Sequence, residues 1–265
     1  MGNTRHLLRK AISVIRRKKL IRNTEAVSQE YTSGWEAFRE KLEKSNSLDE
    51  WLNDNDNTSS FYNVNGEYSN QVFDSTDFYR KTALDALETY YPKARSVAEF
   101  GCGVGRNLIY LHLKHPELTY YGFELCKPGV ELANAAAKKF NLPIQYFQLD
   151  YLNWVPANIQ IPDIDVGFTV FSFEQLPEGN DIALKNIMSK VNLGTFHLEP
   201  VPENYPWTFR GMIGRLDHYK VGYLRNFDKN AKKVAGIENV TIKKINSAHN
   251  PLMFPSLYVC KKTKA

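Results

Sequence analysis

A run of glycines beside carboxylates is the part of this 265-residue chain whose residues best suit chemistry. Residues 97–107 read Val-Ala-Glu-Phe-Gly-Cys-Gly-Val-Gly-Arg-Asn, so Glu99 lies just before Gly101, Gly103 and Gly105. Glycine tolerates positive φ and lets a ligand approach the backbone, and a helix that begins after such a turn offers free N–H groups. The stretch is therefore suited to holding a small charged cofactor.

The charge of Glu99 bears on which cofactor fits. A pyrophosphate would be repelled by this carboxylate, whereas the ammonium group of a methionine moiety would be attracted. The dinucleotide-binding fingerprint also needs glycine at position 106, and Arg106 stands there. The residues favour an ammonium-bearing cofactor over a dinucleotide, although a tight strand-to-helix turn without any ligand would look similar.

Two further carboxylates follow the next two expected strands. Residues 96–100 and 118–124 suit buried strands, the second ending at Glu124, and residues 144–149 make a third strand that is followed by Asp150. Glu124 lies about 20 residues beyond the glycine turn, where an open α/β sheet places an acid that accepts hydrogen bonds from ribose hydroxyls. We therefore expect three strand ends to supply three carboxylates to one site.

The segment Glu-Phe-Gly-Cys-Gly-Val-Gly at 99–105 resembles the first motif of the class I S-adenosylmethionine-dependent methyltransferases, acidic-x-Gly-x-Gly-x-Gly. The resemblance implies S-adenosyl-L-methionine as cofactor and S-adenosyl-L-homocysteine as product, with Asp150 facing the adenine amino group. It implies these cofactor-binding residues: Glu99, Gly101, Cys102, Gly103, Gly105, Asn107, Glu124, Leu125, Asp150, Tyr151 and Phe171.

The resemblance also implies the fold class, α/β with a Rossmann-like methyltransferase sheet, helices on both faces and a C-terminal antiparallel hairpin. We expect further strands at 164–171, 194–198, 240–245 and 257–261, and helices at 76–90, 128–140 and 181–190. The expected domains are a basic amphipathic or flexible tail at 1–30, an N-terminal helical lid at 31–95, and a methyltransferase domain at 96–265. Within the last, a substrate insertion is expected at about 200–236.

A hydroxyl acceptor needs a base that removes its proton, and four side chains are candidates. His249 is favoured because an unperturbed histidine titrates near neutrality, and Glu199 comes next. Strand alternation puts His197 and Glu199 on one face, so that both reach one pocket or both pack. The fourth candidate is Glu174. Many relatives have Leu-Glu-His-Leu at this turn, and Gln175 stands in the histidine place, which puts in doubt a base at that position.

The insertion at 200–236 follows the fifth strand, where this kind of sheet builds substrate pockets. Its cations, aromatics and amides suit an acceptor with many hydroxyls or an anionic group, although a solvated helix face would have the same residues. The candidate acceptor-binding residues are Gln175, Arg210, Arg215, His218, Tyr219 and Arg225.

The runs 196–200 and 223–230 are similar to uncharacterised bacterial methyltransferases associated with surface polysaccharide assembly. This similarity implies O-methylation of a sugar hydroxyl in a surface polysaccharide or glycolipid. A small-molecule or natural-product acceptor is the next alternative. Two more are a non-catalytic S-adenosylmethionine-binding module and an RNA methyltransferase that anchors phosphate with its basic tail.

Charge is concentrated at the N-terminus. Residues 1–22 carry eight Lys and Arg side chains and no acid, so the rest of the chain sums to −3 out of a net charge of +5. Leu7, Leu8, Ala11, Ile12 and Ile15 are spaced helically among these cations, which permits an amphipathic helix on an anionic membrane surface or on a glycan-assembly protein. A disordered, solvated tail is the alternative, and the acidic remainder makes nucleic acid an unfavoured partner.

Composition agrees with one domain plus appendages, since 43% of the residues are hydrophobic. The three cysteines have no metal-binding spacing, no other metal cluster is apparent, and a reducing cytoplasm is the simplest compartment. No apolar run approaches the ~20 residues that cross a bilayer. We expect a cytoplasmic protein, peripheral on the inner membrane face if the basic helix binds there; the sequence does not specify an oligomeric state.

Overall fold

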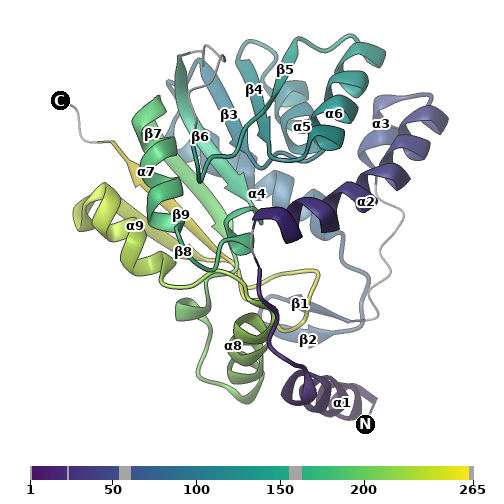
Figure 1. The fold of residues 1–265 in the computed structure, drawn as a ribbon, viewed down its shortest axis with the longest axis vertical. Helices are drawn as coiled ribbons and strands as arrows, with labels where there is room; N and C mark the ends of the chain where they lie inside the picture. The colour runs from purple at the N-terminus through teal and green to yellow at the C-terminus, as the bar shows by residue number, and fades with distance from the viewer. Residues whose placement is uncertain (1, 23, 54–60, 155–162, 263–265) are drawn as a thin grey trace.

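The computed structural model of the chain describes residues 2–22, 24–53, 61–154 and 163–262. Its centre is a seven-stranded sheet of order β5-β4-β3-β6-β7-β9-β8, with helices on both faces (Figure 1). The strands are β3 (Ser96–Phe100), β4 (Thr119–Glu124), β5 (Ile144–Gln148), β6 (Ile164–Val170), β7 (Val191–Glu199), β8 (Val240–Lys244) and β9 (Ser256–Lys261). All seven expected strands are confirmed.

The first five of these strands are parallel, and β9 lies antiparallel between β7 and β8. The expected C-terminal antiparallel hairpin is thus confirmed. Strand β7 begins earlier than expected because Val191 already pairs with Ile164 of β6. Parallel strands end at a common edge, so the segments after Phe100, Glu124, Gln148 and Val170 meet there.

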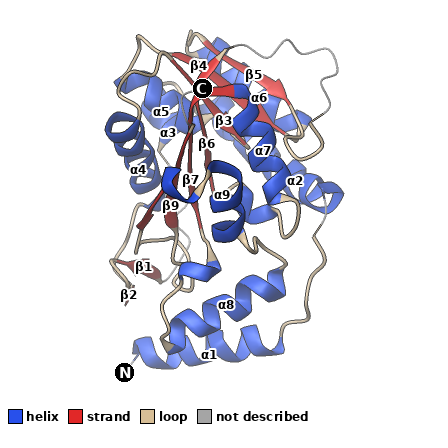
Figure 2. Cartoon of the chain, turned by 90° about the vertical axis from the view of Figure 1, so that its left-hand side faces the viewer, coloured by secondary structure: helices blue, strands red, loops and turns tan. Residues whose placement is uncertain are grey.

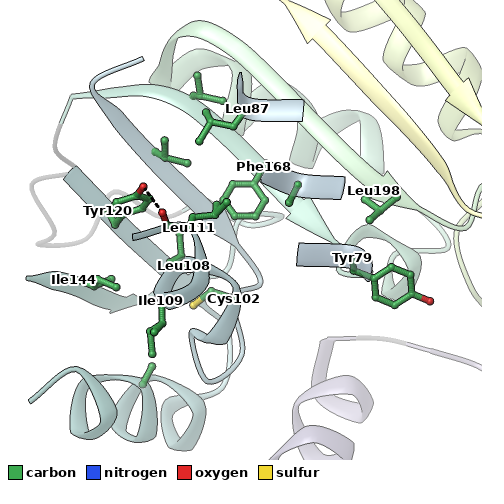
Figure 3. Close-up of a cluster of buried hydrophobic side chains, with 14 of the residues drawn as sticks. Tyr79, Leu87, Cys102, Leu108, Ile109, Leu111, Tyr120, Ile144, Phe168 and Leu198 are labelled. Atoms are coloured by element: carbon green, nitrogen blue, oxygen red, sulfur yellow. Dashed lines mark hydrogen bonds between the residues drawn. The ribbon is translucent and has the colours of Figure 1, made fainter. Parts of the chain in front are cut away.

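Each sheet face carries its own apolar core. On one face Leu108, Tyr120, Phe168 and Leu198 pack with helix residues, as Figure 3 shows. The other face holds Phe100, Phe123, Ile164, Leu184 and Phe227. Both faces are covered, which explains why these parallel strands read as nearly continuous apolar runs.

The covering helices are α4 (Ser75–Tyr90), α5 (Arg106–Lys114), α6 (Lys127–Lys139), α7 (Asn180–Lys190) and α9 (Phe227–Ala235), whereas α8 (Phe209–Val221) lies beyond one end of the sheet (Figure 2). Three short 3₁₀ helices add η1 (Phe173–Gln175), η2 (Pro202–Asn204) and η3 (Ile237–Asn239). Helix α7 begins one residue before the expected start, and α6 begins at Lys127 with proline in its first turn.

The N-terminal region forms α1 (Gly2–Arg16), α2 (Thr24–Lys44), α3 (Leu48–Leu52) and a small hairpin of β1 (Tyr62–Val64) and β2 (Glu67–Ser69). Helix α1 lies beside α8 at one end of the molecule, and α2 runs back along the sheet domain (Figure 2). Helix α2 crosses residue 30, so the boundary expected between tail and lid falls inside a helix. Among the described residues, none of the helices combines the length and apolar character needed to span a bilayer.

Candidate functional site

The glycine turn has the backbone that its residues predict. After β3 ends, Gly101, Gly103 and Gly105 adopt φ values of 76°, 54° and 77°. This left-handed region favours glycine. A Cβ on Gly105 would also collide with the ring of Tyr146, whose hydroxyl donates to the Gly105 carbonyl at 3.1 Å. Conformation and space therefore both require glycine at this turn.

Glu99 is buried at the end of β3 with one oxygen satisfied and one open. Asn107 Nδ2 donates to Glu99 Oε1 at 2.7 Å, whereas Oε2 has no hydrogen-bond partner among the described residues. Burial raises the pKa of Glu99 to about 8, against the opposing effects of the Asn107 hydrogen bond and the Arg80 charge. A cationic donor placed at Oε2 would satisfy this atom and favour the ionised carboxylate.

The other two carboxylates at the strand ends accept hydrogen bonds from backbone N–H groups. Glu124 accepts hydrogen bonds from the N–H groups of Gly103 and Cys126, both at 2.9 Å, so it ties the glycine turn to the start of α6. Asp150 accepts from the backbone of Asn153 at 3.2 Å and from its side chain at 2.9 Å. Burial raises the pKa of Glu124, against the lowering effect of its backbone hydrogen bonds.

All three carboxylates line one cavity of about 810 Å³ at this edge of the sheet. Every residue predicted to bind the cofactor lines it, with the exception of Gly105, whose part is to shape the turn. The cavity is large enough for a nucleoside-sized ligand together with part of a second molecule.

Helix α2 covers the cavity from the side opposite the strands. Its Tyr31 and Trp35 line the cavity, and a Cβ built on Gly103 would lie only 3.0 Å from the Trp35 indole. The indole Nε1 is buried without a partner among the described residues. The sequence predicts a lid in this region, and Trp35, Phe38 and Leu42 at helical spacing predict its first helix. Neither Tyr31 nor Trp35 was predicted to belong to the site.

Residues 17–22, here called the strap, join α1 to α2 and complete the cavity wall. Leu20 N–H donates to the Lys220 carbonyl at 2.7 Å, which fixes the strap to the end of α8. Arg22 pairs with Glu30 at 2.6 Å and lies over the ring of Tyr223 at 4.8 Å. The strap residues that line the cavity are Lys19, Leu20, Ile21 and Arg22, none of which the sequence reasoning assigned to the site.

Phe171, His249 and Tyr79 form an aromatic wall beyond the end of β6. Phe171 has a φ of 53°, a conformation that costs a bulky residue free energy and clusters at functional sites. Its ring centre lies 4.6 Å from that of Tyr79 and 5.5 Å from that of His249. The Tyr79 hydroxyl lies 3.0 Å from His249 Nδ1 and accepts the His249 backbone N–H, also at 3.0 Å.

Of the four candidate bases, His249 and Glu174 line the cavity. More than a third of the surface of His249 is open, yet the surrounding protein, together with the Lys10 charge, lowers the pKa of the imidazole to about 4. The ring is therefore neutral at physiological pH and can accept a proton, but it is a weaker base than the unperturbed histidine on which the sequence-based choice rested.

Glu174 and Gln175 line the same part of the cavity. Gln175 Nε2 donates to Glu174 Oε1 at 2.9 Å, and the remaining oxygens, Glu174 Oε2 and Gln175 Oε1, are buried without partners among the described residues. Burial and the nearby Glu199 raise the pKa of Glu174 well above its usual range. Since the raised pKa favours the protonated carboxyl, whose Oε2 can donate, these two open oxygens favour a ligand that carries both hydrogen-bond donors and acceptors.

His197 and Glu199 share one strand face, as predicted, but neither lines the cavity. His197 is fully buried and bonds to Thr169 at 3.0 Å and Thr195 at 2.8 Å; burial lowers its pKa to about 3. Glu199 accepts the Thr169 hydroxyl at 2.7 Å and the N–H groups of residues 172–174 at 3.0 to 3.1 Å. Of the two outcomes weighed for this pair, the structure shows packing, and Glu199 positions the loop that carries Glu174.

We expect Glu199→Ala to lower the free energy of unfolding by about 3–5 kcal/mol, since it leaves three N–H groups, two of them buried, and a buried hydroxyl without their acceptor. Glu199→Gln should cost about 1–3 kcal/mol, because its amide would place a donor against the N–H of Glu174. Urea titration measures both values. A loss under about 1 kcal/mol for the alanine variant would show that this carboxylate does not hold the loop.

The predicted acceptor-binding residues separate into two groups. Gln175 and Arg225 line the cavity, and Arg225 lies over the ring of Tyr219 at 4.9 Å. Arg210 instead bonds to Asn63 and the Gly66 carbonyl, and Arg215 bonds to the carbonyls of residues 202, 205 and 206. His218 is a buried residue of α8 that packs against Tyr205 and Tyr223, and its neighbour Tyr219 is half exposed; neither lines the cavity. Arg210 and Arg215 of the insertion thus have a structural role, because they donate hydrogen bonds to the backbone carbonyls of irregular segments.

Comparison with solved structures gives the fold a context. The chain is similar to magnesium protoporphyrin IX methyltransferase from Synechocystis PCC 6803 with bound SAM, with a TM-score of 0.56 and 12% identity over 92% of this chain and 99% of that one. It is also similar to the plantazolicin methyltransferase in complex with a monoazolic desmethylPZN analog and SAH. There the TM-score is 0.52, with 13% identity over 71% of this chain and 85% of that one.

Sequence comparison finds shorter likenesses. A 61-residue segment is 39% identical to the tRNA (guanine-N(7)-)-methyltransferase of Shewanella oneidensis, and a 52-residue segment is 38% identical to that of Shewanella piezotolerans. These segments make up 22% and 20% of this chain and 26% and 22% of the relatives, so the likeness spans about a quarter of each relative. No family model matches the chain. The sheet order and the structural likenesses together show that the chain has the class I S-adenosylmethionine-dependent methyltransferase fold.

Proposed function

We propose that the protein is a methyltransferase that uses S-adenosyl-L-methionine. The observation that carries the proposal is the open Oε2 of Glu99, buried beside the glycine turn at the end of β3 and lining the cavity. A carboxylate there pairs with the ammonium group of a methionine moiety. The methyltransferase fold, which brings this carboxylate together with Glu124 and Asp150, supports the same assignment.

The residues present fit the cofactor in its separate parts. Arg80 lines the cavity close to Glu99, so the pair offers opposite charges to the carboxylate and ammonium of an amino acid. Glu124 is the acceptor for ribose hydroxyls, and Asp150 is the acceptor for the adenine amino group. When bound, S-adenosylmethionine supplies a methyl group on a sulfonium, which passes to the acceptor and leaves S-adenosylhomocysteine.

The acceptor group that we propose is a hydroxyl, in first place a sugar hydroxyl of a bacterial surface polysaccharide or glycolipid. A hydroxyl loses its proton as the oxygen–carbon bond forms, and the neutral His249 in the cavity wall accepts that proton. Glu174 Oε2 and Gln175 Oε1 form hydrogen bonds with neighbouring hydroxyls, which can both donate and accept, and so orient the acceptor. We also propose a cytoplasmic location with peripheral membrane or glycan-assembly contacts through residues 1–22, which would suit such an acceptor but does not depend on it.

A methyl-transfer assay tests the proposal. The full chain is incubated with methyl-labelled S-adenosylmethionine and, in parallel, with lipid-linked glycans, free sugars, amphiphilic small molecules, tRNA and protein. Label that is found in a glycan and is stable as an ether supports O-methylation. Cofactor binding without transfer to any of these acceptors would leave a binding module and contradict the enzyme assignment.

RNA is a second candidate acceptor, favoured by the segments shared with tRNA (guanine-N(7)-)-methyltransferases and by the eight cations of residues 1–22. A ring nitrogen of a nucleobase needs no base to remove a proton. Transfer to tRNA that survives loss of the His249 imidazole would therefore favour RNA. A natural-product acceptor, such as the structural neighbour's plantazolicin analog, is distinguished by transfer in the small-molecule arm.

A further inference from the structure

Helix α1 buries only part of its apolar surface. Leu7, Ala11 and Val14 form one stripe that packs against Ile213 of α8 and Leu252. This contact holds the N-terminal helix on the body of the protein, as a helix rather than a solvated tail. The remaining surface of α1 is therefore presented in a fixed orientation.

A second apolar stripe on α1 faces solvent. Leu8, Ile12 and Ile15 each follow a residue of the packed stripe by one position, about 100° round the helix, and are 50%, 48% and 56% exposed. Further round the helix by a similar step comes a basic stripe of exposed side chains: Arg5, Arg9 and Arg16. Apolar and cationic stripes side by side are the pattern of a helix that lies in a membrane interface.

Helix α8 extends this surface. Arg17 pairs with Asp217 at 2.7 Å and Leu20 bonds to Lys220, so the C-terminal ends of α1 and α8 lie together and the helices run parallel (Figure 2). With this geometry the helical repeat puts the exposed residues of both helices on the side away from the sheet. The exposed apolar residues of α8 are Phe209, Met212 and Tyr219, and Trp207 lies just before the helix.

We propose that this α1–α8 face, comprising Leu8, Ile12, Ile15, Trp207, Phe209 and Met212 with the basic stripe of α1, docks the protein on an anionic lipid bilayer. Residues 1–22 carry a charge of +8 and the rest of the chain −3, so a negative surface attracts this end and repels the remainder. Transfer of half-exposed aliphatic side chains from water into the acyl boundary of a bilayer is favourable. RNA phosphates provide no apolar environment for these side chains.

Docking in this orientation brings the cavity to the membrane. The strap leads directly from α1 into the cavity wall, and its Leu20 and Ile21 are 49% and 87% exposed. An acceptor held in the bilayer would then reach the cavity without leaving the surface. This last step rests on the proposed function, whereas the docking itself does not.

Vesicle co-sedimentation tests the docking face independently of activity. The full chain is mixed with vesicles of phosphatidylcholine alone and of an equimolar mixture with phosphatidylglycerol. We expect binding to the anionic vesicles only, weakened about tenfold or more by Ile12→Glu and Ile15→Glu, because each places a charge in the acyl boundary. The matched control is Ile182→Glu on α7, where the side chain is 52% exposed but lies away from this face, and which should bind as the wild type does.

Tryptophan fluorescence tests whether both helices contact lipid. Trp207 is 84% exposed, so anionic vesicles should shift its emission to shorter wavelength, and the shift should be absent from Trp207→Phe. Circular dichroism shows whether each variant keeps its fold. Equal sedimentation of the Ile12→Glu, Ile182→Glu and wild-type chains would overturn the proposal. So would binding to tRNA with none to anionic vesicles, or vesicle binding without any change at Trp207.

Discussion

Glu99→Gln is expected to weaken binding of S-adenosylmethionine about 100-fold, which corresponds to about 2.7 kcal/mol. The substitution keeps an oxygen for the Asn107 hydrogen bond but turns the open Oε2 position into an amide nitrogen, a donor facing the ligand's ammonium. Isothermal titration of S-adenosylhomocysteine measures the effect without catalysis.

A shortened ligand sharpens this test. Methylthioadenosine has the adenosine and the sulfur but lacks the amino-acid group, so Glu99→Gln should leave its affinity unchanged. Glu124→Ala, which removes the ribose acceptor, should weaken both ligands. The surface substitution Glu131→Gln on α6 is the matched control and should change neither. Full-strength binding of S-adenosylhomocysteine to Glu99→Gln would contradict the assignment, and undiminished affinity in Glu124→Ala would contradict the ribose contact.

The raised pKa of Glu99 also predicts proton release. In the folded protein its pKa is about 8 instead of 4.5, so at pH 7 the free carboxyl is mostly protonated, whereas the ligand-bound form is ionised against the ammonium. Binding at pH 7 should therefore release close to one proton, and affinity should rise with pH up to about 8. Titrations in buffers of different ionisation enthalpy count this proton, and Glu99→Gln should release none.

The raised pKa of Glu99 affects folding stability in the opposite direction from cofactor affinity as the pH rises. Between pH 4.5 and about 8 the folded state holds a proton on Glu99 that the unfolded state has lost, so the contribution of this group to stability falls as pH rises. Bound cofactor reverses this loss, since it favours the ionised form. The ligand-free protein should consequently gain more stability from cofactor at pH 8 than at pH 6.

His249→Gln should lower kcat for a hydroxyl acceptor by about 100- to 1,000-fold and leave cofactor affinity unchanged. Glutamine can still meet the Tyr79 hydroxyl but cannot accept the acceptor's proton. Formation of S-adenosylhomocysteine at saturating acceptor measures kcat. Added imidazole should restore part of the activity to His249→Ala, a rescue that a merely structural role would not produce.

The pH profile separates His249 from Glu99. Because the pKa of His249 is lowered to about 4, kcat should fall only below about pH 5, whereas kcat/KM for the cofactor should decline already below about pH 8 as Glu99 takes up a proton. An unchanged kcat in His249→Gln would mean that the acceptor needs no base, as for a ring nitrogen or an amine, and would overturn the hydroxyl assignment.

Much of the fold could be predicted from the chain because its signals are local. Short apolar runs between turn residues predicted every strand of the seven-stranded sheet. Three glycines between Phe100 and Arg106 predicted a turn with positive φ, a conformation that residues with side chains rarely adopt. The three carboxylates at strand ends followed from the same reasoning, since parallel strands end at one edge. The early start of β7 was missed because it depends on pairing with β6.

The residues around the acceptor could not be predicted in the same way. The sequence ranked His249 first among the candidate bases and Glu199 second, but it could not show which of them reach the cavity. Packing decides this: Glu199 accepts backbone N–H groups of a loop, whereas His249 lies beside Tyr79 and Phe171 in the cavity wall. Trp35 and Arg22 line the cavity because α2 and the strap, which lie far from the glycine turn in the sequence, fold over it.

The sequence by itself determined the sheet, the glycine turn and the three acids, because strand patterns, backbone conformation and chain order act over a few residues. Tertiary structure alone decided which polar side chains face the cavity, that Glu99 keeps an open oxygen, and that α1 covers α8 while leaving a second apolar stripe exposed. Burial and hydrogen-bond satisfaction depend on every element that surrounds a group, and those elements meet only when the chain has folded.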